Sequence, residues 1–95
     1  MPAAHRQGDI CTGHGCFGPR PSAQGSPNVF INGKPSHRQG DAWHAHCCGP
    51  SCHGGQAAAG SPNVFVNGKP KCRIGDPVNC GSTMATGSPN VFVNS

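Results

Sequence analysis

The sequence contains no glutamate, leucine or tyrosine, and it has only three aspartates and one tryptophan among 95 residues. Valine, isoleucine and phenylalanine together number thirteen. So few large apolar side chains cannot fill a sizeable core, and small domains of this kind usually need a metal ion, disulfides or a partner subunit for stability. The composition therefore predicts one small domain over residues 1–95 that depends on more than its core.

Long apolar runs are also missing. None approaches the roughly 18 to 20 residues of a membrane span, and the first residues (MPAAHR) lack the apolar stretch of a signal peptide. We therefore expect a product made in the cytoplasm, with no stable membrane insertion. The seven cysteines are an odd number. Without a secretory signal a full disulfide framework is not expected, so metal ligation is the better interpretation of the thiols.

The scarcity of carboxylates argues against catalysis. Each aspartate follows an arginine by three residues, in the pairs Arg6 and Asp9, Arg38 and Asp41, and Arg73 and Asp76. Carboxylates for acid–base work need different environments, whereas these three occupy equivalent positions, so we expect structural ion pairs. A zinc enzyme would also need a general base, and the usual glutamate is absent. We expect no enzyme.

The positive charge of the chain is mild. The formal net charge is +4, and the seven basic residues form no block of five. We therefore expect no nucleic-acid partner, although a zinc-stabilised nucleic-acid-binding module remains the alternative function.

What the sequence does contain is a threefold repeat. The phrase GSPNVFIN at residues 25–32 returns as GSPNVFVN at 60–67 and 87–94, and HRQGD at 5–9 and 37–41 returns as CRIGD at 72–76. Units of about 27 to 35 residues imply one supersecondary unit used three times. The third copy stops at Asn94 and Ser95, where the others continue into Gly-Lys-Pro. We expect a ring of three units closed by the chain's own ends, without an effector extension.

Each repeat has the pattern of a short strand followed by a tight turn. Apolar residues alternate with Asn and Phe, and Asn32-Gly33 and Asn67-Gly68 favour the positive φ angles of a hairpin. No ten-residue stretch shows a helical period free of Gly or Pro, so the sequence predicts an all-β domain without a long helix. We expect a small core of Val29, Ile31, Val64, Val66, Val91 and Val93.

Histidines and cysteines occupy two kinds of position. His5, His37 and Cys72 are equivalent in the repeat, and we interpret them as ordinary packed or surface side chains. The units diverge after each aspartate, where His14, His46 and Cys80 follow at similar distances.

Closure of the three units would bring these last three residues together at one end of the domain. His53 is near enough in sequence, in the loop 48–53, to add a fourth ligand. Zinc accepts such tetrahedral sets of His nitrogen and Cys sulfur. From spacing alone, Cys48, Cys47 or His44 could replace one of the four.

The repeated Gly-Ser-x-x-Val-x-[Ile/Val]-Asn phrases, together with Arg-x-Gly-Asp, resemble the PAAR-repeat family, whose members sharpen the spikes of type VI secretion systems and contractile phage tails. The Pro-Ala-Ala-Arg that names the family is present as PSHR at 35–38 and PKCR at 70–73, without the two alanines.

This resemblance implies a pointed, pyramid-like β domain with pseudo-threefold symmetry, whose broad base caps a trimeric β-helical spike, one chain per trimer. It implies one zinc ion per chain near the tip, held by three histidines and one cysteine, which match His14, His46, His53 and Cys80. It also implies a place at the tail tip of a virion, or at the tip of a type VI secretion spike, with transient contact with the target envelope.

Overall fold

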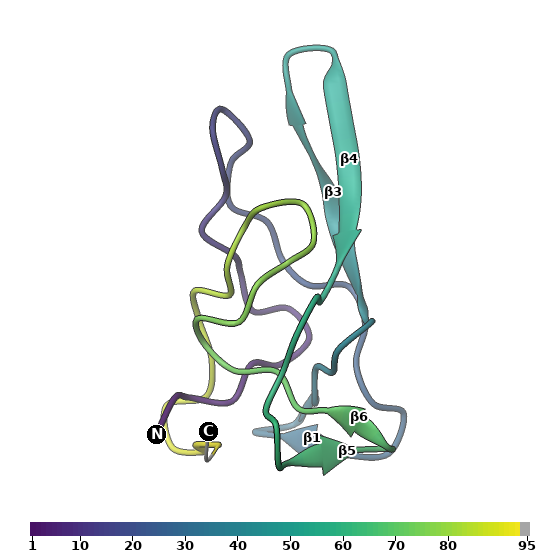
Figure 1. Ribbon diagram of the computed structural model, residues 1–95, viewed down its shortest axis with the longest axis vertical. Helices are drawn as coiled ribbons and strands as arrows, with labels where there is room; N and C mark the ends of the chain where they lie inside the picture. Colours follow the sequence, from purple (N-terminus) through teal and green to yellow (C-terminus); the bar gives the residue numbers. More distant parts are fainter. Residues whose placement is uncertain (94–95) are drawn as a thin grey trace.

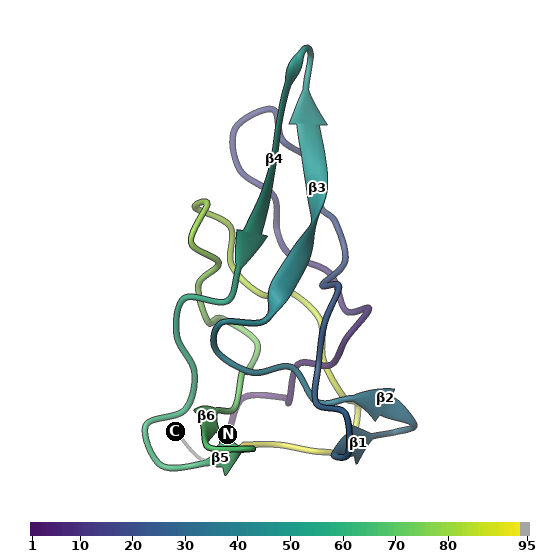
Figure 2. The same ribbon diagram turned by 90° about the vertical axis from the view of Figure 1, so that its right-hand side faces the viewer.

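The computed structural model describes residues 1–93, and that part of the chain is all-β with no helix, as predicted. Figures 1 and 2 show a chain that tapers from a wide end, where the N-terminus and the shortest strands lie, to a narrow end formed by one long hairpin. The molecule measures 37 × 24 × 21 Å. A helix long and apolar enough to cross a membrane is absent from the described residues.

Two equivalent hairpins lie at the wide end. They are β1 (Phe30–Ile31) with β2 (Lys34–Pro35), and β5 (Phe65–Val66) with β6 (Lys69–Pro70), both antiparallel. The predicted turns are confirmed, because Asn32 and Gly33 have φ angles of 55° and 78°, and Asn67 and Gly68 have 54° and 77°. Two successive positive φ angles match the twist of the paired strands.

The third repeat has its partner in the N-terminal segment. Ala3 pairs with Phe92, and the Ala4 amide donates to the Val91 carbonyl at 2.9 Å. The same bond joins Ser36 to Val29 and Lys71 to Val64 in the other two repeats. Asn94 and Ser95, where the third motif stops, lie outside the described residues.

The longest strands are β3 (Ala42–Cys48) and β4 (Ser51–Gln56), which form the narrow end. Their turn is only Gly49-Pro50, with Gly49 at a φ of 60°, so the expected loop over 48–53 is wrong. His46 lies directly opposite His53 in this pair, after an irregularity in register between Trp43 and His46.

Three backbone hydrogen bonds link repeat-equivalent residues in a closed ring. His5 donates to the Cys72 carbonyl at 3.1 Å, His37 to His5 at 3.3 Å, and Cys72 to His37 at 3.1 Å. The buried Lys71 ammonium donates to the same three carbonyls. The three predicted Arg–Asp pairs are confirmed, with nitrogen–oxygen distances of 2.8–2.9 Å.

The core lies between the ring and the narrow end. It consists of Cys11, Trp43, Ala57, Cys72, Val78 and Met84. The predicted valine and isoleucine core is wrong for most of its members, since only Val66 and Val93 are buried and Val29 and Val91 remain 38 % exposed. All six side chains instead line an open hollow of about 300 Å³ at the wide end.

His5 and His37 are fully buried between the ring and Trp43, so of the two predicted environments the packed one is correct. Burial, followed by the repulsion that a protonated His37 would exert, lowers the pKa of His5 to about 3. Burial also lowers the pKa of His37 to about 4. Both imidazoles are therefore neutral in the folded protein at pH 7.

Acid should destabilise the fold through these two histidines. Their unfolded pKa is near 6.5, so the stability they contribute is complete above that pH and is lost as pH falls toward 4. The loss at pH 4 should be roughly 3 kcal/mol for each histidine. Denaturant titrations at pH 7, 5 and 4 measure it.

The variant His37→Cys, which carries the residue of the third repeat, should lose about half of this pH dependence, because one of the two groups is gone. His44→Gln is the matched control, since His44 is exposed and should leave the slope unchanged. A slope in His37→Cys equal to that of the unmodified chain would contradict the assignment.

Candidate metal centre

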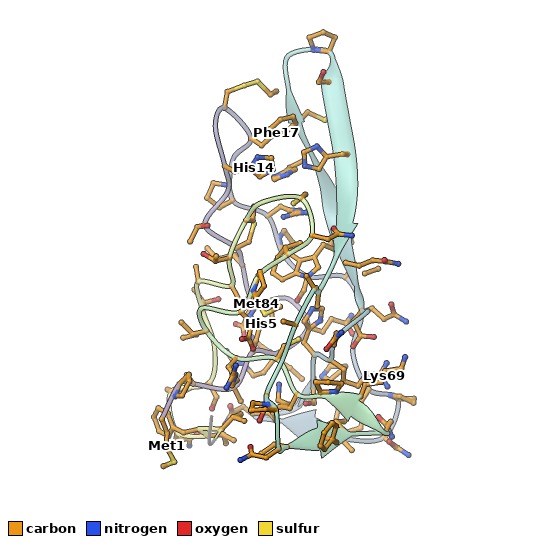
Figure 3. The ribbon with its side chains drawn as sticks, viewed as in Figure 1. Met1, His5, His14, Phe17, Lys69 and Met84 are labelled. Atoms are coloured by element: carbon orange, nitrogen blue, oxygen red, sulfur yellow. A yellow bond between two sulfur atoms is a disulfide. The ribbon has the colours of Figure 1, made fainter. Side chains whose placement is uncertain are left out.

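Four candidate ligands come together near the narrow end. They are His14 from the N-terminal loop, His46 from β3, His53 from β4 and Cys80 from the turn after Val78. Their ligand atoms all lie within 4.8 Å of one another. Figure 3 shows the labelled His14 well above the core residue Met84, toward the narrow end. The quartet expected from the sequence therefore shares one place.

The three histidines converge through one ring nitrogen each. The Nε2 atom of His53 lies 3.1 Å from that of His14 and 2.8 Å from that of His46. The opposite nitrogen of His46, Nδ1, lies 2.7 Å from the Gly18 carbonyl and donates its proton there, which leaves Nε2 free to ligate.

A tetrahedral metal ion fits this arrangement. Zinc with bonds of about 2.1 Å to nitrogen and 2.3 Å to sulfur places its ligand atoms about 3.4 to 3.6 Å apart. The nitrogens here are slightly closer than that, and the full group spans at most 4.8 Å, so small side-chain movements suffice. Each neutral imidazole has only one N–H donor. Without an ion, the three converging nitrogens therefore cannot all be satisfied by hydrogen bonds to one another.

The electrostatics of the cluster favour the ligating forms of its members. Desolvation, together with the neighbouring His46 and His14, lowers the pKa of His53, which favours the neutral ring. Burial raises the pKa of the Cys80 thiol, but hydrogen bonds from the Ser82 backbone and from Arg20 outweigh it and lower the pKa overall. A lower pKa favours the thiolate, which is the form that binds metals.

Phe17 packs on all three histidine rings and was missed by the sequence analysis. Its ring centroid lies 4.9 Å from that of His14, 5.0 Å from His46 and 4.3 Å from His53. Gly13 allows the loop to close here, because a Cβ atom at Gly13 would lie 2.5 Å from the Phe17 carbonyl oxygen. A single aromatic residue in a Gly-rich segment beside His14 was the available signal.

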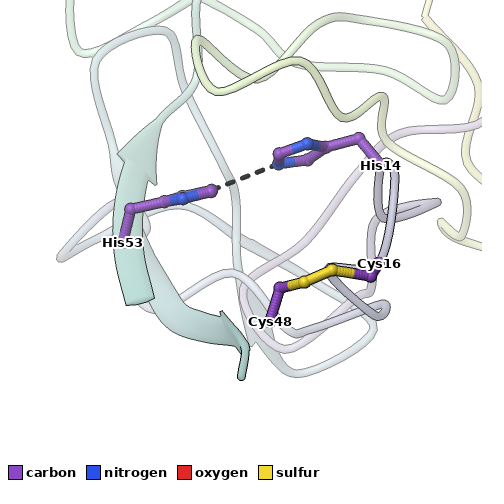
Figure 4. Close-up of a disulfide and its surroundings, with 4 residues drawn as sticks. All are labelled: His14, Cys16, Cys48 and His53. Atoms are coloured by element: carbon purple, nitrogen blue, oxygen red, sulfur yellow. Dashed lines mark hydrogen bonds between the residues drawn. A yellow bond between two sulfur atoms is a disulfide. The ribbon is translucent and has the colours of Figure 1, made fainter. Parts of the chain in front are cut away.

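Four of the remaining cysteines form disulfides, contrary to the interpretation of the thiols as ligands. Cys16 pairs with Cys48, and Cys47 pairs with Cys52. Figure 4 shows the Cys16–Cys48 bond beside His14 and His53. Cys47 and Cys48 are therefore not spare ligands.

His44 is exposed, and it is not among the four residues whose ligand atoms converge. The reason lies in the hairpin, where the irregularity in register after Trp43 separates His44 from the part of β3 that pairs with His53. None of the three alternatives to the original four residues is supported.

The comparisons with known proteins bear on the second half of the chain. Residues 49–95 match the family model described as PAAR motif. This segment holds two copies of the GSPNVFVN phrase and two of the four candidate ligands, His53 and Cys80. A search of the curated proteins finds no match.

Replacement of one ligand should remove the metal. Purified protein should contain about one zinc per chain, and His53→Ala should lose most of it, because three ligands no longer close a tetrahedral site. The melting temperature should fall in parallel, since metal binding contributes to folding free energy. Elemental analysis and thermal melts measure both.

His44→Ala is the matched control, since His44 is an exposed histidine of the same hairpin. It should keep full metal content. Equal metal loss in both variants, or a folded wild-type protein with no metal, would refute the ligand set.

Proposed function

The chain is a PAAR-repeat protein, and from that premise we propose that it forms the sharp tip of a trimeric β-helical spike in a contractile injection machine. One chain caps one trimer, and the spike belongs to a contractile phage tail or to a type VI secretion system. The tip assists penetration of a target envelope mechanically, in transient contact with it, and without catalysis.

The apolar wide end is the observation that carries this proposal. Three phenylalanines at the same repeat position are exposed there, Phe30 and Phe65 at 56 % and Phe92 at 50 %. Beside them, valines of all three repeats line the hollow of about 300 Å³. A small protein rarely leaves so many large apolar side chains in contact with water unless they meet a partner.

The repetition of this surface fits a partner with threefold symmetry. Each repeat presents the same Val-Phe pair, at 29–30, 64–65 and 91–92, so one chain can offer a similar contact to each of three identical subunits. The hairpins at the same end are two-stranded sheets, so β1 and β5 are edge strands that strands of a spike can pair. These repeated contacts support a ratio of one chain to three spike subunits.

The narrow end supports a mechanical role. We propose that His14, His46, His53 and Cys80 hold one zinc ion there, as a closed four-ligand set of the kind used in structural sites. The Cys16–Cys48 disulfide links the same loop to the hairpin, and the Cys47–Cys52 disulfide joins the two strands of the hairpin. All three aspartates are committed to arginines, so none is placed to act as a general base.

The distribution of positive charge favours this role over nucleic-acid binding. Arg6, Arg38 and Arg73 are paired with aspartates, and Arg20 and Lys71 are buried. Lys34 and Lys69 alone among the seven basic side chains are exposed. Two lysines make a weak electrostatic footprint for a nucleic-acid backbone.

Co-expression with a candidate trimeric spike protein from the same genome tests the proposal. The intact complex should contain one chain per spike trimer by native mass measurement. Phe65→Asp should weaken binding by at least about tenfold, because burial of a phenylalanine is worth roughly 1.5 to 3 kcal/mol and a charge would replace it.

Ile10→Asp is the matched control, since Ile10 is 39 % exposed and does not line the hollow. It should bind as the unmodified chain does. A ratio of three chains to three spike subunits, or equal losses in both variants, would refute the docking face.

A further inference from the structure

Arg20 is a buried cation that has no carboxylate partner among residues 1–93. Arg20 is only 4 % exposed. Every aspartate is already bound by the arginine three positions before it, and the sequence has no glutamate. A buried charge is costly unless other groups compensate it, so the contacts of Arg20 need a reason.

The guanidinium of Arg20 contacts two sulfur atoms. Nη1 donates to Cys11 Sγ at 3.1 Å and Nη2 donates to Cys80 Sγ at 3.2 Å. Nε donates to the His44 carbonyl at 2.7 Å, and the group lies over the Trp43 ring with its central carbon 5.1 Å from the ring centroid. The planar guanidinium is therefore held against β3 through Nε, while its Nη1 and Nη2 groups face the two thiols.

The hairpin leaves room for this placement. A Cβ atom at Gly55 of β4 would lie 2.8 Å from Arg20 Nη2 and 3.1 Å from a Val78 methyl group. Gly55 pairs with Trp43 across the hairpin, so both strands border the guanidinium. The Cys80 side chain itself stands on a tight turn in which Gly81 has a φ of 109°.

We propose that Arg20 is the positioning residue of the metal centre, holding the Cys80 sulfur toward the three histidine nitrogens and compensating the charge of the ligating thiolate. This inference rests on the ligand set proposed above and is independent of docking to a spike. The same cation is in turn compensated by the thiolate, which accounts for its burial without a carboxylate. Loss of a group that holds a metal ligand in place typically lowers metal affinity by about 10- to 100-fold.

Cobalt(II) is the probe, because its complex with a thiolate absorbs in the near ultraviolet and its d–d bands report a tetrahedral site. Arg20→Met removes the N–H donors while keeping an apolar stem. The thiolate then donates more charge to the metal, so the sulfur-to-cobalt band should move to longer wavelength. Cobalt affinity by competition titration should fall about tenfold or more.

Two further variants separate positioning from general stability. Lys71→Met is the matched control, because Lys71 is the other buried cation that has no carboxylate partner in the part of the chain that the structure describes. Its ammonium bonds the His5, His37 and Cys72 carbonyls instead of a candidate ligand. It should lower the melting temperature but leave the cobalt band in place. Arg20→Lys keeps the charge but cannot span both sulfurs, so it should give an intermediate band and affinity, and it replaces Arg20→Met if that variant does not fold.

The outcomes are distinct. An unmodified protein that binds no cobalt refutes the metal centre itself. A wild-type cobalt spectrum and affinity in Arg20→Met or, if that variant is unfolded, in Arg20→Lys refutes the role of Arg20, and so does an equal band shift in Lys71→Met.

Discussion

A ring of three backbone hydrogen bonds between His5, His37 and Cys72 joins the three repeats, and the Lys71 ammonium occupies its centre. The three N–H donors of one ammonium match three converging carbonyls, so a single side chain satisfies groups from every repeat. Cys72 of this ring belongs to the core and Lys71 lines the apolar hollow, so the ring borders both.

Polar contacts supply much of the stability that a larger apolar core would otherwise provide. Each aspartate accepts hydrogen bonds from an arginine side chain and from the backbone amide of the same arginine, so both carboxylate oxygens are satisfied. Buried ion pairs are tolerable when the geometry is good and the remaining lone pairs are used. The same pair, repeated in three units, stabilises the fold where few apolar side chains are buried.

Toward the narrow end the cross-section leaves no room for a core of aliphatic side chains. The stacked Phe17 ring, the histidine cluster and the two disulfides occupy that region instead. A metal bound by four side chains from separate segments would tie the loop, the hairpin and the turn together at one point. The proposed metal centre and the disulfides thus take the place of an apolar core near the narrow end.

Local chemistry in the sequence determined the hairpin turns, the arginine–aspartate pairs and the all-β class, because Asn-Gly turns and contacts three residues apart need no distant partner. Repeat spacing also indicated His14, His46 and Cys80. Spacing left Cys48, Cys47 and His44 open as replacements for one ligand, and only the tertiary structure decided against them and placed Arg20 against Cys80. Side chains alternate between the two faces of a strand. The register of the β3–β4 pair therefore determines which of its side chains face the other candidate ligands. The strand valines face an open hollow for a related reason: strand pattern predicts an apolar face, but only the packing of the three repeats determines whether that face is covered.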